Sequence, residues 1–458
     1  MKKEDNKTEY IDNEKFDKLL REKNINFLIG SGAANGMIPT LSLGGKNLSI
    51  EELITDLKMD DVHKKIVYMY YFYKIIEPLA LGKNEFYQKI KEDDKKIFKE
   101  LAMKRCRKSS ISITKKEKSQ IEIIEIKNTK VNDTNKTCLS EFIEKTEKNR
   151  KREVLKNYKE FTKLLYEFLI NESNEQPKRI NIFTTNYDLI FERVFDDFLF
   201  QNPLIYFNDG SRGFFKKFIS NKNFYLNVTH SGYNDNYSRQ LPTINLFKMH
   251  GSISWCLDSE EDEISKQSKT IYVRDIDFDD KNSLINKLKD DIKKFRKILK
   301  DLDQELCKIE SKNIDDYISI IDRNINTKKN KKKINNFFEN YKKLPIINPD
   351  KYKFSETVLE QHYYQLIRSF SYELEKKNTI LIVFGFSFAD EHIKDIFERS
   401  LLNPSLLVFI ISYSKDSQKK MREYFDKYNN VKFLPDFNNI EKGNFNFLNE
   451  LLGGTNER

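Results

Sequence analysis

Four short polar segments of this chain carry groups that bind phosphates and transfer protons: glycines, side-chain amides and carboxylates, and an imidazole. Each segment directly follows an apolar run. The segments are Gly30-Ser31-Gly32, Thr185-Asn186-Tyr187-Asp188, His250-Gly251 and Gly385-Phe386-Ser387. Their place after apolar runs predicts that they lie in loops at the ends of strands.

The first of these segments belongs to a glycine-rich stretch, NINFLIGSGAANGMIPT, at residues 24–40. Glycines let the backbone turn tightly and approach phosphates, and a following helix offers free N–H groups at its N-terminus. The stretch therefore favours a site for a dinucleotide pyrophosphate. Its spacing is GxGxxxG rather than GxGxxG, and a glycine-rich turn of this kind often only ends a strand.

The elements that position these segments follow from the apolar pattern. Five apolar runs predict strands, at residues 25–29, 180–183, 244–249, 380–384 and 406–411. Helical patterns lie between them, at 49–57, 62–78 (ended by Pro78), 83–103, about 151–171, 189–199 and from near 389. Buried strands that alternate with helices indicate an α/β, Rossmann-like parallel sheet with helices on both faces. Ligands bind at the carboxyl ends of such strands, so the four segments are expected to converge on one crevice.

Composition narrows the class of protein. The 458 residues are enough for two or three domain-sized units, and Lys+Arg 81 against Asp+Glu 71 gives a net charge of +10. Both signs alternate, which indicates a solvated surface and does not require a nucleic-acid partner. The four cysteines form no CxxC pair, so neither a disulfide framework nor a metal site is expected. No signal peptide or membrane-spanning run is present, so we expect a cytoplasmic protein without a membrane partner.

The chain divides into an N-terminal extension at 1–23, a first part of the core at 24–256, a helical insertion at 257–350, and a second part of the core with C-terminal helices at 351–458. Residues 104–150 read as an insertion with one β-like piece at 121–126. Apolar residues in steps of three and four form a heptad seam across 285–309. That seam predicts a long helix, either packed inside the chain or exposed as a subunit or partner interface. The Lys-rich residues 328–333 predict a solvated loop, with contact to DNA as the less favoured alternative.

The segments GSGAANGMIP, FTTNYD, KMHGSISW and FGFSFAD, in this order, resemble the motif series of the sirtuins. They resemble more closely the divergent sirtuin-like NAD hydrolases of bacterial anti-phage defence. The resemblance spans roughly residues 24–412 but rests on four short windows. Deacylase sirtuins carry two CxxC pairs around a zinc ion and an Asp-Phe-Arg segment after the glycine-rich loop. This chain has neither, and Pro39-Thr40-Leu41-Ser42 stands after the loop.

The resemblance implies a role for individual residues. It implies that Gly30, Ser31, Gly32 and Ala33 hold the NAD pyrophosphate and that Gly385 and Ser387 line the adenosine side. Thr185 is placed among the NAD-binding residues, Asn186 holds the nicotinamide ribose and the attacking water, and Asp188 shapes the nicotinamide pocket. His250 is the implied catalytic histidine.

Each implied role has a structural alternative. Asn186 or Ser387 could cap the helix that follows it, and Asp188 could be an acidic residue in the first turn of a helix. His250 could be a polar residue that merely ends a strand. The single tryptophan, Trp255, is explained by core packing.

The function implied by the resemblance is hydrolysis of NAD, as substrate, to nicotinamide and ADP-ribose, without a metal. It implies an anti-phage effector that depletes cellular NAD when triggered. It also implies homo-oligomers and, in some relatives, a partner ATPase of the HerA type. Two alternatives stay open: an NAD-dependent protein deacylase, against which the absent cysteine pairs argue, and a non-catalytic sensor of NAD or ADP-ribose.

Overall fold

The computed structural model describes residues 13–35, 37, 48–80, 112–116, 123–127, 150–172, 178–257, 270–274, 283–306, 308–309, 311–348, 360–438 and 440–453. The predicted helix at 83–103 and most of the predicted insertion at 104–150 lie outside these ranges. So do residues 39–42, which follow the glycine-rich loop.

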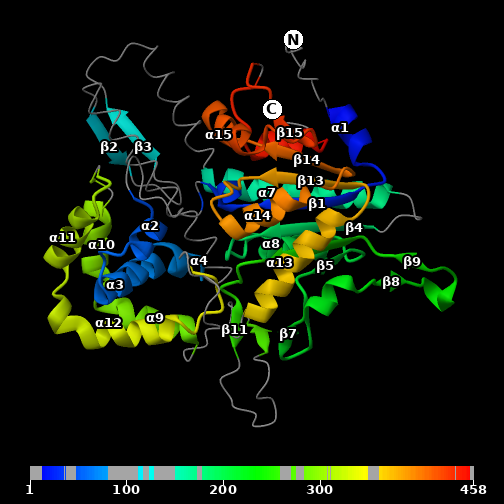
Figure 1. The fold of residues 1–458 in the computed structure, drawn as a ribbon. Coiled ribbons are helices and arrows are strands. Elements are labelled where there is room, and N and C mark those ends of the chain that lie inside the picture. Colours follow the sequence, from blue (N-terminus) through cyan, green and yellow to red (C-terminus); the bar gives the residue numbers. More distant parts are fainter. Residues whose placement is uncertain are drawn as a thin grey trace.

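A seven-stranded sheet forms the centre of the molecule (Figure 1), in the order β15-β14-β13-β1-β4-β10-β5. The five predicted strands are all present, as β1 (Asn24–Ile29), β4 (Arg179–Thr184), β10 (Thr243–Lys248), β13 (Thr379–Phe384) and β14 (Leu406–Ile411). Two edge strands, β5 (Tyr206–Asn208) and β15 (Val431–Leu434), were not predicted, because each is too short to show a pattern. Every neighbouring pair is parallel, which confirms the Rossmann-like α/β fold.

The strand order contains a switch point between β1 and β13. From β1 the chain adds β4 and β10 on one side; it then returns and adds β13, β14 and β15 on the other. Apart from the edge strand β5, this is the order of a doubly wound sheet. In open α/β sheets, ligands bind outside the carboxyl ends of the strands at such a switch point.

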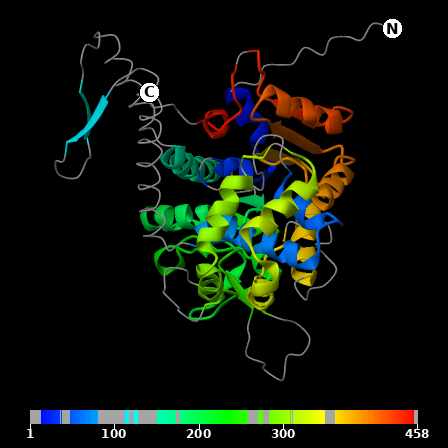
Figure 2. The same ribbon diagram turned by 90° about the vertical axis from the view of Figure 1, so that its left-hand side faces the viewer.

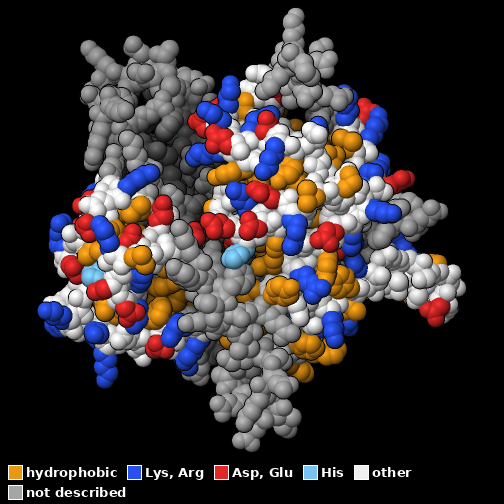
Figure 3. Space-filling view, in the orientation of Figure 1, with side chains coloured by type: hydrophobic (Ala, Val, Ile, Leu, Met, Phe, Trp, Pro, Cys, Tyr) orange, Lys and Arg blue, Asp and Glu red, His pale blue; other side chains and the backbone are white. Residues whose placement is uncertain are grey.

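Helices cover both faces of the sheet, and alternate side chains of the strands point to each. On one face, Phe27 packs with α1 (Asn13–Leu20), α7 (Arg150–Asn171), α8 (Ile190–Gln201) and α16 (Phe445–Leu451). On the other, Leu28 packs with α13 (Glu360–Glu375), α14 (Glu391–Ser400) and α15 (Lys415–Phe425). Figure 3 shows basic and acidic side chains interspersed over the surface, in line with the alternating charge of the sequence.

Four asparagines form a buried ladder across the sheet. Asn26, Asn181, Asn245 and Asn208 occupy equivalent register positions on β1, β4, β10 and β5. The side-chain amide of each of the last three donates to the Oδ1 of the preceding asparagine, at 2.8, 2.8 and 2.9 Å. Because a shift by one residue would turn these amides to the opposite face, the ladder fixes the strand register.

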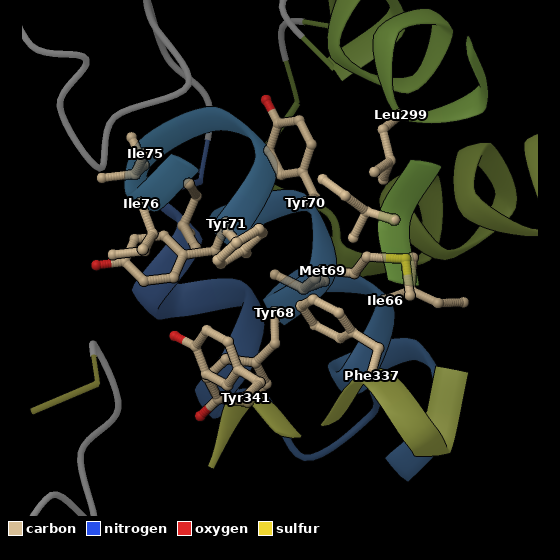
Figure 4. Close-up of a cluster of buried hydrophobic side chains, with 14 of the residues drawn as sticks. Ile66, Tyr68, Met69, Tyr70, Tyr71, Ile75, Ile76, Leu299, Phe337 and Tyr341 are labelled. Atoms are coloured by element: carbon tan, nitrogen blue, oxygen red, sulfur yellow. The ribbon is translucent and has the colours of Figure 1, made fainter. Parts of the chain in front are cut away.

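A second, helical unit packs on its own hydrophobic cluster. It contains α2 (Ile50–Thr55), α3 (Asp61–Tyr71), α4 (Glu77–Leu79), α9 (Leu284–Lys293), α10 (Arg296–Leu306), α11 (Ile314–Asn324) and α12 (Thr327–Tyr341). Figure 2 views this unit from its outer side, and Figure 4 shows Leu299 and Phe337 packed against Ile66 and Met69 of α3. A π-helical turn (Phe72–Ile76) joins α3 to α4, which contains Pro78, so the aromatic helix ends one residue later than predicted.

The heptad seam packs inside the chain. Its members from Ile285 to Leu306 are at most 4% exposed and belong to the cluster that includes α3. This decides between the two predicted arrangements, because buried residues cannot serve as a subunit or partner interface. The single long helix predicted there is two helices, α9 and α10, since the helix breaks between Lys293 and Arg296.

The prediction of a loop at residues 328–333 was wrong. These residues form the first two turns of α12, which Asn326 caps by accepting a hydrogen bond from Lys329 N. The helix forms because Ile334, Phe337 and Tyr341 place an apolar stripe on the cluster, while the lysines face solvent.

Three small sheets complete the fold. β6 (Ser211–Arg212), β7 (Lys217–Ile219), β11 (Trp255–Leu257) and β12 (Ile271–Val273) form one, and β8 (Thr229–His230) pairs with β9 (Arg239–Gln240). β2 (Ser112–Lys116) pairs with β3 (Ile123–Lys127), which overlaps the β-like piece predicted at 121–126. Trp255 is 6% exposed and packs in the core, as predicted. None of the helices in the described part of the chain is both long and apolar enough to cross a bilayer.

Candidate functional site

Two glycine loops meet at the switch point. Gly30, after β1, donates its N–H to Phe384 O at 3.0 Å, and Gly32 donates to Gly385 O, after β13, at 2.9 Å. A Cβ on Gly30 would lie less than 3.0 Å from Gly385 O, and a Cβ on Gly385 would lie less than 3.0 Å from Ala33 N. Gly385 also has a φ of +63°. Glycine is therefore required here for the contact between the loops, whether or not a phosphate binds.

A cavity of about 820 Å³ adjoins this contact and extends over the ends of β13 and β14. Small-molecule sites commonly enclose about 300–1,000 Å³. Four of the predicted residues line it: Gly32, Ala33, Gly385 and Ser387. The other six predicted residues are not among its lining: Gly30, Ser31, Thr185, Asn186, Asp188 and His250.

Ser412 is a buried polar residue in the wall of the cavity. Ser412 follows β14, lines the cavity and is 4% exposed. Its Oγ is buried and has no hydrogen-bond partner within the described ranges. Lys420 and Lys442 also line the cavity, so its wall carries ammonium groups as well as this hydroxyl. Glu153 lies in the same wall, so the cavity is lined by charged groups of both signs and suits a polar ligand.

Asn186 and His250 leave the sheet side by side. Each stands two residues beyond one of the paired strand ends, Thr184 and Lys248, and Met249 N donates to Thr184 O at 2.8 Å. Both loops therefore start at the same edge, next to the glycine loop of β1. Thr185 and Asn186 are half-buried, and Asn186 N donates to Thr184 Oγ1 at 3.1 Å. Asn186 is not the helix cap considered above, because Leu189 occupies that position of α8.

Asp188 lies just before the N-cap of α8 and not in its first turn, where Glu192 is the acidic residue, so the structural alternative considered for it was wrong. It is 6% exposed, and its Oδ1 accepts a hydrogen bond from Ile190 N at 3.0 Å, at the start of α8. Its backbone carbonyl accepts a hydrogen bond from Lys248 Nζ. Lys248 in turn lies 3.0 Å from Glu192 Oε1. Burial raises the pKa of Glu192, and Lys248 opposes that rise.

His250 is held at its backbone and at its ring. Its carbonyl accepts a hydrogen bond from Ile347 N at 2.9 Å. Its Nε2 lies 3.1 Å from Asp390 Oδ2, and both side chains are only 10% exposed. Asp390 also caps α14, since Oδ1 accepts a hydrogen bond from Ile393 N at 3.2 Å. A buried imidazole in contact with a carboxylate has a fixed ring orientation.

The sequence analysis did not associate Asp390 with His250. Asp390 closes the segment FGFSFAD, and the pattern favoured it only as part of a helix start. Ser387, considered above as the cap, is exposed in the loop before Asp390. Ser31 is likewise exposed. The signal that could have identified Asp390 is its position: it is an acidic residue a few positions after β13, the strand that also ends in the Gly385 loop.

No protein-family model matches the chain, and a search of the curated proteins found no match either. The site combines an amide and an imidazole on neighbouring loops, a carboxylate on the imidazole, and a cavity beside two glycine turns. In the described ranges, no three His, Cys, Asp or Glu side chains lie close enough together to hold a metal ion. These groups can position a water and accept a proton next to a bound nucleotide.

Proposed function

We propose that this chain is an NAD hydrolase that releases nicotinamide and ADP-ribose and acts as a sirtuin-like effector of anti-phage defence. One observation carries the proposal: four segments with sirtuin-like residues, far apart in sequence, follow β1, β4, β10 and β13 at one edge of the sheet. The cavity also fits the substrate in size, because about 820 Å³ is large enough for a nucleotide, and its wall contains polar and charged residues, among them Lys420, Lys442 and Glu153.

The proposed reaction breaks the bond between C1′ of the ribose and the nicotinamide nitrogen. The electron pair of that bond goes to the nitrogen, which loses its positive charge, while positive charge develops on the ribose. Asn186 positions the water that forms the new C1′–O bond. His250 accepts the proton that this water, or a ribose hydroxyl, gives up. Orientation and general-base catalysis are the two contributions asked of the protein.

The two sides of the switch point have different roles in this proposal. The glycine loops and the cavity over β13 and β14 would hold the adenosine and the phosphates. The loops after β4 and β10 would face the nicotinamide ribose. A dinucleotide is long enough to reach both.

The test is incubation of the purified protein with NAD, with nicotinamide and ADP-ribose quantified together. Equal release of both products supports hydrolysis. Nicotinamide release that requires an acylated peptide would indicate a deacylase instead. Because the activity of a defence effector is held off until triggered, the same products are also measured in phage-infected cells that express the chain.

A sensor of NAD or ADP-ribose is the second candidate, favoured by the finding that neither Asn186 nor His250 lines the cavity. It predicts tight binding of ADP-ribose with no nicotinamide release in either setting. Homo-oligomers, a HerA-type partner and a cytoplasmic location rest on the resemblance and the composition. A native mass measurement of the chain purified from its own cells tests the first two.

A further inference from the structure

We propose that Asp390 is a positioning residue that fixes the tautomer of His250 and thereby makes Nδ1 the nitrogen that accepts the proton. This inference rests on the proposed function for its catalytic consequence. The contact itself does not depend on that function: it joins the loop after β10 to the start of α14, at 3.1 Å.

The contact determines where the proton of the neutral ring lies. A lone pair on Nε2 would face the negative charge of Asp390 Oδ2 at 3.1 Å, so the neutral ring carries its hydrogen on Nε2. A neutral imidazole has one N–H, and Nδ1 then keeps its lone pair. Within the described ranges His250 Nδ1 has no hydrogen-bond partner. It is therefore the ring nitrogen that remains available to a water or a ribose hydroxyl.

The surroundings leave the ring little freedom to turn. The His250 carbonyl is bonded to Ile347 N, and Gly251 forms a bridge with Ile346 at a φ of +87°. His250 and Asp390 are both nearly buried. When Nδ1 takes a proton, the ring becomes positively charged next to a carboxylate that is already in place. A base oriented by a third group in this manner is a recurring arrangement in enzymes that activate a nucleophile.

Asp390 also caps α14, and substitutions can separate the two roles. Asn and Ser are both good caps, so D390N and D390S preserve the helix start. In D390N the side-chain amide can donate as well as accept a hydrogen bond, so it no longer determines whether Nε2 carries a hydrogen. In D390S the hydroxyl is too short to reach the ring. D390A removes both functions and reports what loss of the cap does.

The helical unit offers a matched control. Asp60 caps α3 by accepting from His63 N at 2.8 Å, and its Oδ1 lies 2.6 Å from His63 Nδ1. D60N and D60S therefore make the same chemical change at an Asp cap in contact with a histidine, far along the chain from the strand ends. They should leave turnover within about twofold of the unsubstituted protein, since surface caps away from a site affect stability rather than chemistry.

The first measurement is steady-state NAD cleavage. We expect D390N and D390S each to lower kcat by about 100-fold with KM within about threefold, because a misplaced base affects the chemical step rather than binding. Thermal melting checks that both variants fold. If folded D390N and D390S keep kcat within about threefold, while H250A abolishes turnover, Asp390 has no positioning role.

The second measurement reads the tautomer directly and needs no activity. The chain has five histidines, so ¹⁵N-labelled imidazoles can be assigned with H250Q as reference. We expect His250 to carry its hydrogen on Nε2 in the unsubstituted protein and to lose that preference in D390S. A His250 that is protonated on Nδ1 overturns the inference. If His250 carries its hydrogen on Nε2 but the protein never cleaves NAD, the role of Asp390 in fixing the tautomer stands and only the proposed function is refuted.

Discussion

The two sides of the switch point differ in how they use polar groups. On the side of β13 and β14, a cavity of about 820 Å³ leaves the Ser412 hydroxyl without a partner among the described residues. On the side of β4 and β10, two pairs of ionisable side chains are in contact, Lys248 with Glu192 and His250 with Asp390, while Glu192 Oε2 is buried without a hydrogen-bond partner among the described residues. One side therefore offers space for a ligand, whereas the other holds ionisable groups in contact with one another.

This difference has a physical basis. A buried charge without a partner is costly, so groups that must be oriented precisely enough for chemistry are buried in pairs. A binding surface has the opposite requirement, because a group that is already satisfied by the protein contributes little to a ligand. The glycine contact between Gly30, Gly32 and Gly385 brings the two kinds of surface together without side chains between them.

The largest expected effect is on the rate of NAD cleavage, from substitutions in the loops after β4 and β10. H250A and N186A should each lower the rate of NAD cleavage by about 100- to 10,000-fold, the range of general acid–base catalysis by one positioned group. Nicotinamide release measures it. H230A, on the small β8–β9 hairpin, is the matched histidine control and should have no effect. Turnover that survives both H250A and N186A contradicts the proposed mechanism.

The buried ion pair should be the next most sensitive. K248M leaves Glu192 buried without its cation and should lower the free energy of unfolding by about 3–5 kcal/mol. The control is K163M, because Lys163 is 53% exposed and its nearest carboxylate oxygens lie 3.9 and 4.0 Å away. Its loss should cost less than about 1 kcal/mol. Urea denaturation measures the free energy of unfolding of both variants. Equal losses of stability would mean that the Lys248–Glu192 pair contributes no more than an exposed pair.

The same pair predicts a pH dependence. Burial raises the pKa of Glu192 in the folded state, so the folded protein binds that proton more tightly than the unfolded chain. Its contribution to stability is full below the usual glutamate pKa and is lost as the pH rises through the raised value. K248M removes the cation that opposes the rise, so its destabilisation should be larger at pH 8 than at pH 5. The double variant K248M/E192Q should lose this pH dependence.

A single methyl group should disturb the contact between the glycine loops that follow β1 and β13. G385A places a Cβ less than 3.0 Å from Ala33 N, at a φ of +63°, whereas G453A has a φ of +99° and nothing within 4 Å. Both substitutions strain the backbone, by about 1 kcal/mol. Only G385A adds a clash between backbones, so it should be about 2 kcal/mol more destabilising than G453A. Thermal melting of the two variants isolates the effect of close approach.

The smallest effect is expected from a substitution in the cavity wall at the end of β14. S412A removes the buried hydroxyl that has no partner in the described ranges, so it should leave the folded protein unchanged or slightly more stable. If a nucleotide uses that hydroxyl, S412A should weaken ADP-ribose binding about 3- to 10-fold by calorimetry. Ser405, before the other end of β14, bonds to Asn403 Oδ1 at 2.9 Å and serves as control. Equal affinities for S412A and S405A would place the ligand elsewhere.

Much of the fold could be predicted because local signals agreed with it. The runs that became β1, β4, β10, β13 and β14 are almost wholly apolar, and strands buried on both faces require that. The helix after Ser49 was equally predictable, since Ser49 and Glu52 form a capping box. The strand-end positions of Asn186 and His250 follow from the same pattern, because ends of parallel strands share an edge.

Other features had no local signal. The seam at 285–309 has one periodicity whether it packs inside the chain or against another subunit, and only the burial of Leu288 and Leu299 under α3 decides it. The lysines at 328–333 read as a loop because the apolar stripe that makes α12 a helix begins after them, at Ile334.

The sequence by itself determined the layers of this protein and the edge at which its reactive residues lie, because apolar periodicity and strand direction are local properties. The tertiary structure alone decided which residues touch. It brought Asp390 into contact with His250, placed Gly385 against the loop of Gly30 and Gly32, and formed a cavity over the ends of β13 and β14. Such contacts join segments that are distant in the chain. They depend on how the two halves of a doubly wound sheet meet, which no short stretch of sequence encodes.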